Sequence, residues 1–181
     1  MLALTDGVVA IAMTLLVLDI QLSEGLRGAQ LSRALDEVQS QLGAFLLSAV
    51  VIALFWRAHH EALRSVERID SYLFWLNVGF LVLVSLIPFP TRVLEDYGDQ
   101  FLGPGLYGAV IGTAALLLYA MALHICRASG RSWRCTPLPA QAFVFLLSVG
   151  IARISPAAAI YSWAAAVPLS VWADRIAARA G

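Results

Sequence analysis

The stretch SYLFWLNVGFLVLVSLIPFPT, residues 71–91, decides the fold class of this chain. It runs for 21 residues without a charged side chain. A helix needs about 20 consecutive apolar residues to cross the hydrocarbon core of a bilayer. The stretch is therefore predicted to be a transmembrane helix.

Further apolar segments lie on both sides of this stretch. The six predicted helices lie approximately at 2–22, 40–57, 71–91, 104–126, 138–153 and 156–173. The last two are short and are separated by a turn from Arg153 to Pro156, which predicts a helical hairpin. The sequence therefore predicts an all-α integral membrane protein with six transmembrane helices in a single domain, residues 1–181.

The composition excludes a soluble globular domain. Hydrophobic residues make up 60% of the chain and charged residues 13%, whereas soluble domains carry about 25% charged residues. The net charge is zero, from twelve arginines and twelve acidic residues, so no basic patch indicates nucleic-acid binding.

No basic stretch precedes the first apolar segment and no suitable cleavage site follows it, so we expect this segment to be retained rather than removed as a signal peptide.

The arginines are distributed unevenly between the loops. Eight lie in or beside the second loop, the fourth loop and the C-terminal tail: Arg57, Arg64, Arg68, Arg127, Arg131, Arg134, Arg175 and Arg179. The other four are Arg27, Arg33, Arg92 and Arg153, on the side where most loop carboxylates cluster. Because arginine-rich loops stay in the cytoplasm, both termini are predicted to be cytoplasmic.

Two further features concern helix ends. The connection SEGLRGAQLSRALDEVQS, residues 23–40, has apolar residues at helical spacing between Leu26 and Val38, which predicts a short amphipathic helix at the outer interface. Pro88 and Pro90 flank Phe89, and the loss of helical hydrogen bonds there predicts the end or a kink of the third helix.

Ionisable residues inside a membrane are costly and invite functional hypotheses. Asp6 and Asp19 lie near the two ends of the first segment, where they either mark the water boundaries or find partners. His59 and His60, at the inner end of the second segment, either face lipid headgroups or pair with Asp6. Because neighbouring helical residues point about 100° apart, these two histidines do not share a metal ion, and no metal site is predicted.

The first segment also carries an apolar stripe. Ile11, Leu15 and Leu18 fall on one helical face, with Thr14 beside them. From the residues alone, this stripe is typical of ordinary helix packing. Asn77 in the third segment is a separate candidate, either for an interhelical hydrogen bond or for packing.

Several motifs are absent from the sequence. There is no TVGYG-like stretch for a carbonyl filter and no arginine-rich voltage sensor. Walker, HExxH and GxSxG motifs are also absent, so neither an enzyme nor a cofactor is expected.

Three ordered segments carry a resemblance to a known family. They are LTDGVVAIAMTLLVLDI at 4–20, FWRAHH at 55–60 and WLNVGFLVLVSLIPFPTRVL at 75–94. Together they cover about the first half of the chain and resemble the prokaryotic branch of the transmembrane protein 175 family of potassium channels. The resemblance implies a homotetramer in which the first helix of each subunit lines the pore.

The resemblance also implies roles for individual residues. Ile11, Leu15 and Leu18 match the apolar layers of the pore, and Thr14 matches a hydroxyl layer implicated in the preference for potassium over sodium. The triplet Leu4-Thr5-Asp6 matches the family's Phe-Ser-Asp, although the upstream arginine of that pattern is missing here.

The aspartate and a histidine of the second segment belong, in the family, to a polar network beneath the pore helix. The candidate network here comprises Thr5, Asp6, His59, His60 and Asn77, with the histidine partner of Asp6 left open. The implied function is a leak-type potassium channel of modest selectivity in a bacterial plasma membrane, with potassium ions, lipid and further copies of the chain as partners. The alternative is a proton-conducting or proton-coupled transporter, in which Asp6 and the histidines titrate, since histidine has a pKa near 6.5.

Overall fold

The computed structural model describes residues 2–20, 22, 25, 27–64, 66, 69–130, 140–165 and 169. Within these ranges the chain forms helices and turns and no strand, which confirms the predicted all-α class. The elements are α1 (Leu2–Leu18), α2 (Ala29–Leu63), α3 (Ser71–Leu86), α4 (Pro88–Asp96), α5 (Leu102–Ala128), α6 (Ala140–Ala152), α7 (Pro156–Ser162) and the 3-10 helix η2 (Trp163–Ala165).

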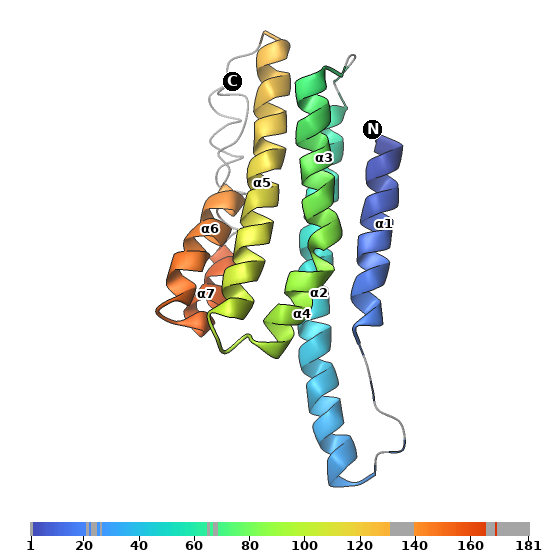
Figure 1. The fold of residues 1–181 in the computed structure, drawn as a ribbon, viewed down its shortest axis with the longest axis vertical. Coiled ribbons are helices and arrows are strands. Elements are labelled where there is room, and N and C mark those ends of the chain that lie inside the picture. The colour runs from blue at the N-terminus through green and yellow to red at the C-terminus, as the bar shows by residue number, and fades with distance from the viewer. Residues whose placement is uncertain are drawn as a thin grey trace.

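The long helices lie side by side with alternating direction (Figure 1). The α1 helix flanks α2 and α3 on one side of the bundle, and the α6–α7 hairpin packs against α5 on the other side. Each predicted segment overlaps a helix, but the end of the predicted segment 156–173 falls largely outside the described residues.

Three helical spans among the described residues are long and apolar enough to cross a membrane: α2, the α3–α4 unit and α5. The apolar helices α1, with 17 residues, and α6, with 13, are shorter. At 1.5 Å per residue they extend about 26 Å and about 20 Å, somewhat less than the hydrocarbon thickness of about 30 Å.

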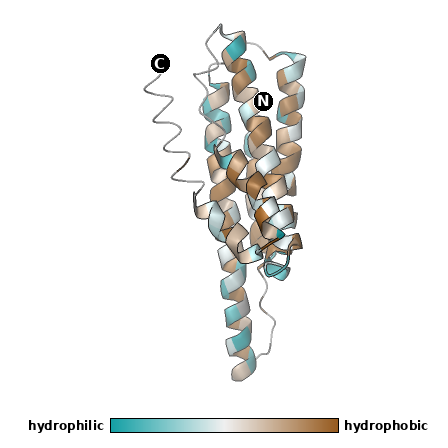
Figure 2. Cartoon of the chain, turned by 90° about the vertical axis from the view of Figure 1, so that its left-hand side faces the viewer, coloured by the Kyte–Doolittle hydropathy of each residue, from teal (hydrophilic) through white to brown (hydrophobic). Residues whose placement is uncertain are grey.

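The α2 helix differs from the sequence prediction. The stretch expected to form a separate amphipathic helix is the first part of α2, which continues unbroken to Leu63; Leu26 lies outside the described residues. This part of α2 projects beyond the other helices (Figure 1) and carries more hydrophilic residues than the bundle (Figure 2).

The third predicted helix is broken at its prolines. The α3 helix ends at Leu86, and α4 begins at Pro88 with a change of direction (Figure 1). Proline has no N–H to donate, but the first turn of a helix needs no such donor. The prolines therefore produce a kink between two helices.

The core is organised around α5, whose glycines allow close packing against α6. A Cβ atom at Gly108 would lie 2.7 Å from the Ser148 hydroxyl, and one at Gly112 would lie 2.7 Å from the side chain of Leu146. Buried hydrogen bonds add further links: Ser48 bonds Thr91 at 2.7 Å and Tyr107 at 3.1 Å, which joins α2, α4 and α5. The half of the bundle around α5 is thus held by apolar packing and buried polar contacts.

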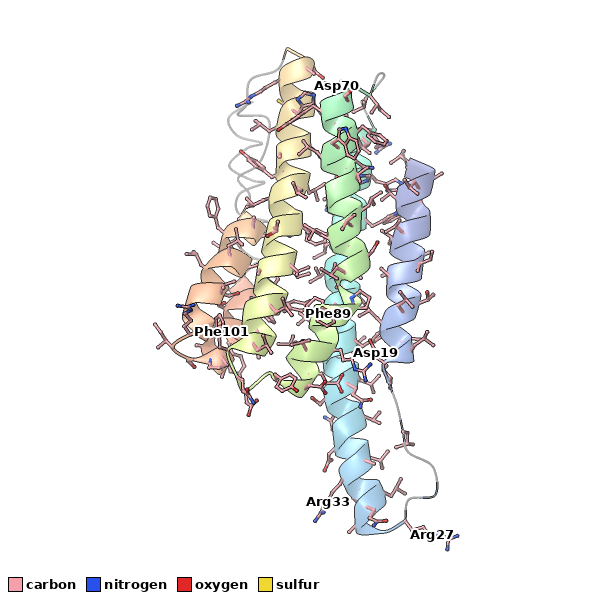
Figure 3. All side chains as sticks on the ribbon, viewed as in Figure 1. Asp19, Arg27, Arg33, Asp70, Phe89 and Phe101 are labelled. Atoms are coloured by element: carbon pink, nitrogen blue, oxygen red, sulfur yellow. The ribbon has the colours of Figure 1, made fainter. Side chains whose placement is uncertain are left out.

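The two ends of the molecule carry different charged residues. Arg27 and Arg33 lie at one end, Asp70 lies at the other, and Asp19 lies between them at the end of α1 (Figure 3). Five of the arginines predicted to be cytoplasmic lie outside the described residues, namely Arg68, Arg131, Arg134, Arg175 and Arg179.

Candidate functional site

The α1 helix has one exposed apolar face. Ile11 is 61% exposed, Leu15 43% and Leu18 67%. Thr14 is also exposed and lies between them. The structure therefore places the three predicted constriction residues and the predicted selectivity residue together, on a face that the chain's own helices leave open.

The opposite face of α1 is buried. Thr5, Val9, Ala12 and Leu16 are its buried residues, and the helix packs against α2 and α3. Ala12 and Leu16 are almost fully covered. This packing fixes which side of α1 points outward.

The Thr14 hydroxyl donates a hydrogen bond to the carbonyl oxygen of Ile11, at 2.8 Å. The hydroxyl proton is therefore directed along the helix. A hydroxyl oxygen also has two lone pairs, which remain able to accept a hydrogen bond or contact a cation.

Asp6, near the start of α1, is held by two side chains of α2. The Trp56 indole Nε1 donates to its Oδ1 at 2.8 Å, and the His60 Nε2 lies 3.5 Å from the same oxygen. The rings of Trp56 and His60 lie 4.6 Å apart. The carboxylate is half-exposed, so this contact sits at the edge of the bundle.

His59 points in a different direction and is fully buried. Its Nε2 lies 2.6 Å from the amide oxygen of Asn77 on α3, and its ring stacks on Phe80 with centroids 5.3 Å apart. Because an amide oxygen can only accept, Nε2 of His59 is the donor. The histidine that contacts Asp6 is therefore His60.

The residues of the predicted polar network thus form two separate contacts, and Thr5 is buried near one of them. One pair links α1 to α2 through Asp6, and the other links α2 to α3 through His59 and Asn77. Thr5 is fully buried near the same end of α1. Within the described residues, no group of three or more His, Cys, Asp or Glu side chains is placed to hold a metal ion.

Sequence reasoning missed Trp56. It precedes His60 by four residues and so shares its helical face, and a tryptophan N–H in an apolar segment usually needs a partner. These two facts together were a usable signal for a contact with Asp6.

The C-terminal end of α1 has a separate ion pair. The Asp19 carboxylate lies 3.6 Å from the Arg92 guanidinium of α4. Both side chains are partly exposed, as expected for a pair at a water boundary.

The comparisons with known proteins agree with this architecture. Residues 1–88 match the family model described as endosomal/lysosomal potassium channel TMEM175. A potassium channel of Streptomyces collinus is 33% identical over 129 residues, which cover 69% of this chain and 63% of that protein. The chain spans between about half and two thirds of the length of such bacterial relatives.

A solved structure and a vertebrate relative extend the comparison. The crystal structure of a lysosomal potassium-selective channel TMEM175 homolog from Chamaesiphon minutus matches with a TM-score of 0.78 and 26% identity, over 95% of both chains. A Danio rerio protein described as an endosomal/lysosomal proton channel is 21% identical over 125 residues, which cover 68% of this chain and 24% of that protein.

Proposed function

This chain belongs to the TMEM175 family, and on that premise we propose that it forms a passive potassium channel in a bacterial membrane. The family and the bacterial relatives are described as ion channels, not as enzymes. The observation that carries the proposal is the exposed apolar face of α1, which includes the predicted constriction residues Ile11, Leu15 and Leu18.

The proposed pore requires several copies of the chain, because a single α1 cannot enclose a path for ions. We place four copies around one axis, each with the exposed face of α1 toward the centre. The buried back of α1 supports this arrangement, since packing against α2 and α3 fixes the outward side of the helix. Both termini would lie in the cytoplasm.

The constriction would consist of successive apolar rings. At 1.5 Å per residue, Ile11 and Leu15 lie about 6 Å apart along the axis, and Leu15 and Leu18 about 4.5 Å apart. Rings of this kind conduct when they are wide enough for a partly hydrated cation, and they close by expelling water. Ile11 and its neighbours would then form both the constriction and the gate.

Selectivity in such a pore would be modest. Aliphatic side chains cannot replace the hydration shell of an ion, and only Thr14 offers oxygen atoms on this face. Its proton is engaged by the Ile11 carbonyl, so the lone pairs are the part of the hydroxyl left to meet a cation. A preference for potassium over sodium would arise at this layer.

The polar contacts behind α1 would hold the pore helix in its orientation. Asp6 is tied to Trp56 and His60, and the adjacent His59 is anchored to Asn77. A rotation of α1 would break the Asp6 contacts and move Ile11 away from the axis. These residues would act on conduction through position and not by touching the ion.

The test is ion flux through purified protein in liposomes with a potassium gradient. Wild type should pass potassium faster than sodium, and Ile11→Asn should change the rate or the ratio because it makes the narrowest ring polar. Val82→Asn on α3, which alters a residue that is 60% exposed on another helix, is the matched control. Absence of flux above empty liposomes, with the protein shown to be folded, would refute the channel.

A proton pathway is the second candidate. The contact between Asp6 and His60 pairs two titratable groups at the start of α1, and the Danio rerio relative is described as a proton channel. His60→Gln should abolish a flux carried through this pair, as measured with a trapped pH-sensitive dye. If potassium flux falls and proton flux persists, His60 has a positioning role only.

A further inference from the structure

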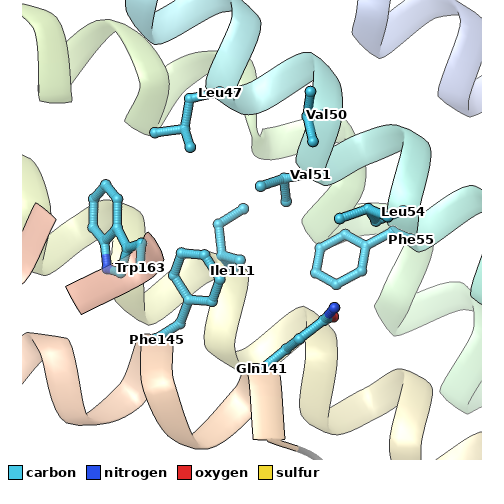
Figure 4. A pocket seen from close by; sticks show the side chains of 9 residues that line it. All are labelled: Leu47, Val50, Val51, Leu54, Phe55, Ile111, Gln141, Phe145 and Trp163. Atoms are coloured by element: carbon cyan, nitrogen blue, oxygen red, sulfur yellow. The ribbon is translucent and has the colours of Figure 1, made fainter. Parts of the chain in front are cut away.

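An apolar groove lies on the side of the bundle away from α1, between α2, α5, α6 and η2. The groove is open to its surroundings on one side, and the empty space in it amounts to about 510 Å³ when that open side is included. Its lining residues are Leu47, Val50, Val51, Leu54, Phe55, Ile111, Gln141, Phe145 and Trp163 (Figure 4). Gln141 is the one residue of this set with an amide or charged side chain.

The groove is expected to lie at membrane depth. Its walls include α2 and α5, which are both long and apolar enough to span a bilayer. On α2 the lining residues fall within the uncharged run 42–56, which ends at Arg57. A water molecule needs two to four polar partners, and this lining offers too few, so hydrocarbon is the favoured filling.

A cation lies next to the groove on the same helix. Val50, Leu54 and Arg57 are spaced i, i+4 and i+7, so they share one face of α2. Arg57 is exposed and makes no ion pair with any described residue, although Glu61 follows one turn later. Because Arg57 directly follows the apolar run, we expect its guanidinium at the level of the lipid phosphates.

We propose that this groove binds an anionic phospholipid, with one acyl chain between α2, α5 and α6 and the phosphate on Arg57. The apolar lining can bury the acyl chain of the lipid, and the unpaired guanidinium can bind its anionic phosphate. The groove is lined by residues from α2, α5, α6 and η2 and by none from α1, so the lipid is bound at a place separate from the exposed face of α1.

The test uses the full-length protein, purified with equal amounts of phosphatidylglycerol and phosphatidylcholine, with retained lipid counted by native mass spectrometry. Wild type should retain phosphatidylglycerol preferentially. Arg57→Gln should reduce that preference about fivefold, the typical contribution of one arginine at an anionic surface. Leu54→Trp should fill the groove and displace the lipid, because Leu54 stands at its partly exposed edge.

Two matched controls separate the site from general effects. Arg127→Gln removes an exposed cation at the end of α5, and Val82→Trp adds an indole to an exposed face of α3. Both should retain lipid like wild type. Unchanged selectivity in Arg57→Gln would overturn the proposal even if Leu54→Trp failed to fold. Wild-type protein without retained lipid would also overturn it and would indicate that protein covers the groove.

Discussion

The α5 and α1 helices differ in how much of their surface the rest of the chain buries. The α5 helix is buried along much of its length and meets α6 through glycines so close that a single added carbon would clash. The α1 helix is buried on one face only and leaves large apolar side chains exposed on the other. The apolar surface of α5 is buried within the chain itself. The exposed apolar face of α1 can be covered only by molecules outside the chain.

Because of this difference, mutations in the two helices should affect stability and transport separately. Changes around α5 act on contacts within one chain, so they should alter folding before they alter transport. Changes on the exposed face of α1 remove few contacts within the chain, so they should alter transport while folding is preserved. The following predictions test that separation, beginning with the largest effect.

The first prediction compares two glycines. Gly108→Leu should yield little folded protein, because a Cβ there would lie 2.7 Å from the Ser148 hydroxyl and 2.8 Å from the carbonyl oxygen of Phe145. Gly7→Leu on α1 should fold normally, because nothing lies within 4 Å of the added carbon. Monodisperse yield on size-exclusion chromatography measures both. Equal yields would show that the α5–α6 contact is looser than described.

The second prediction compares the two faces of α1. Leu16→Ala should destabilise the fold by about 2–5 kcal/mol, since it removes a buried side chain and leaves a cavity. Leu18→Ala should change stability by less than about 0.5 kcal/mol, because its side chain is exposed. Unfolding in a denaturant series would measure each value. If Leu18→Ala strongly lowered the free energy of unfolding of the assembled protein only, the Leu18 side chain would be buried between subunits.

The third prediction concerns the buried histidine. Asn77→Leu should cost about 1–3 kcal/mol because it leaves Nε2 of His59 without an acceptor. Adding His59→Phe should recover part of that loss, since both polar groups are then gone. The same denaturant series measures this double-mutant cycle. Strict additivity of the two changes would mean that the hydrogen bond contributes nothing.

The smallest effect is expected at the N-terminal end of α3, just before the stretch long enough to span a membrane. The backbone N–H of Leu73 and the side chain of His124 hold the pKa of the Asp70 carboxyl below its ordinary value of 3.8. A lowered folded-state pKa means that the ionised group stabilises the fold at neutral pH, and that this contribution is lost as the pH falls through the folded value.

Asp70→Ala should therefore lower the melting temperature slightly at neutral pH, and the difference from wild type should shrink in acid. Thermal melts over a pH series provide the measurement. Asp99→Ala, in an exposed turn, is the control and should show no such trend. If the melting temperature of Asp70→Ala stayed below that of wild type by the same amount at every pH, the ionised carboxylate would not be the cause.

The sequence predicted the apolar segments well because their length and composition depend on the bilayer alone. The beginning of α2 was predicted wrongly, although the sequence carries the signal for a continuous helix. The spacing of Leu31, Leu35 and Val38 is already in phase with the apolar residues that follow, and no proline interrupts the stretch. A continuous helix is therefore the natural outcome, and polar residues are tolerated where α2 extends beyond the bundle.

The site was predictable in composition but not in pairing. Residues near the N-terminal end of α1 could be recognised as a polar group, yet His59 and His60 are adjacent and point to different neighbours. Which histidine faces Asp6 depends on how α1 and α3 flank α2, and this is a tertiary fact. The direction of the stripe on α1 is likewise a tertiary fact, since periodicity shows a face without showing what it meets.

The side-chain contacts of Asp6 and Asp19 attach α1 to its neighbours near both of its ends. Asp6 is held by α2 near the start of α1, and Asp19 is held by Arg92 of α4 just beyond its end. A rod fixed in this way cannot swing like a lever about either end. Because Ala12 and Leu16 are also almost fully covered, the middle of α1 is supported as well, and Ile11 faces outward from a helix that is held along its length.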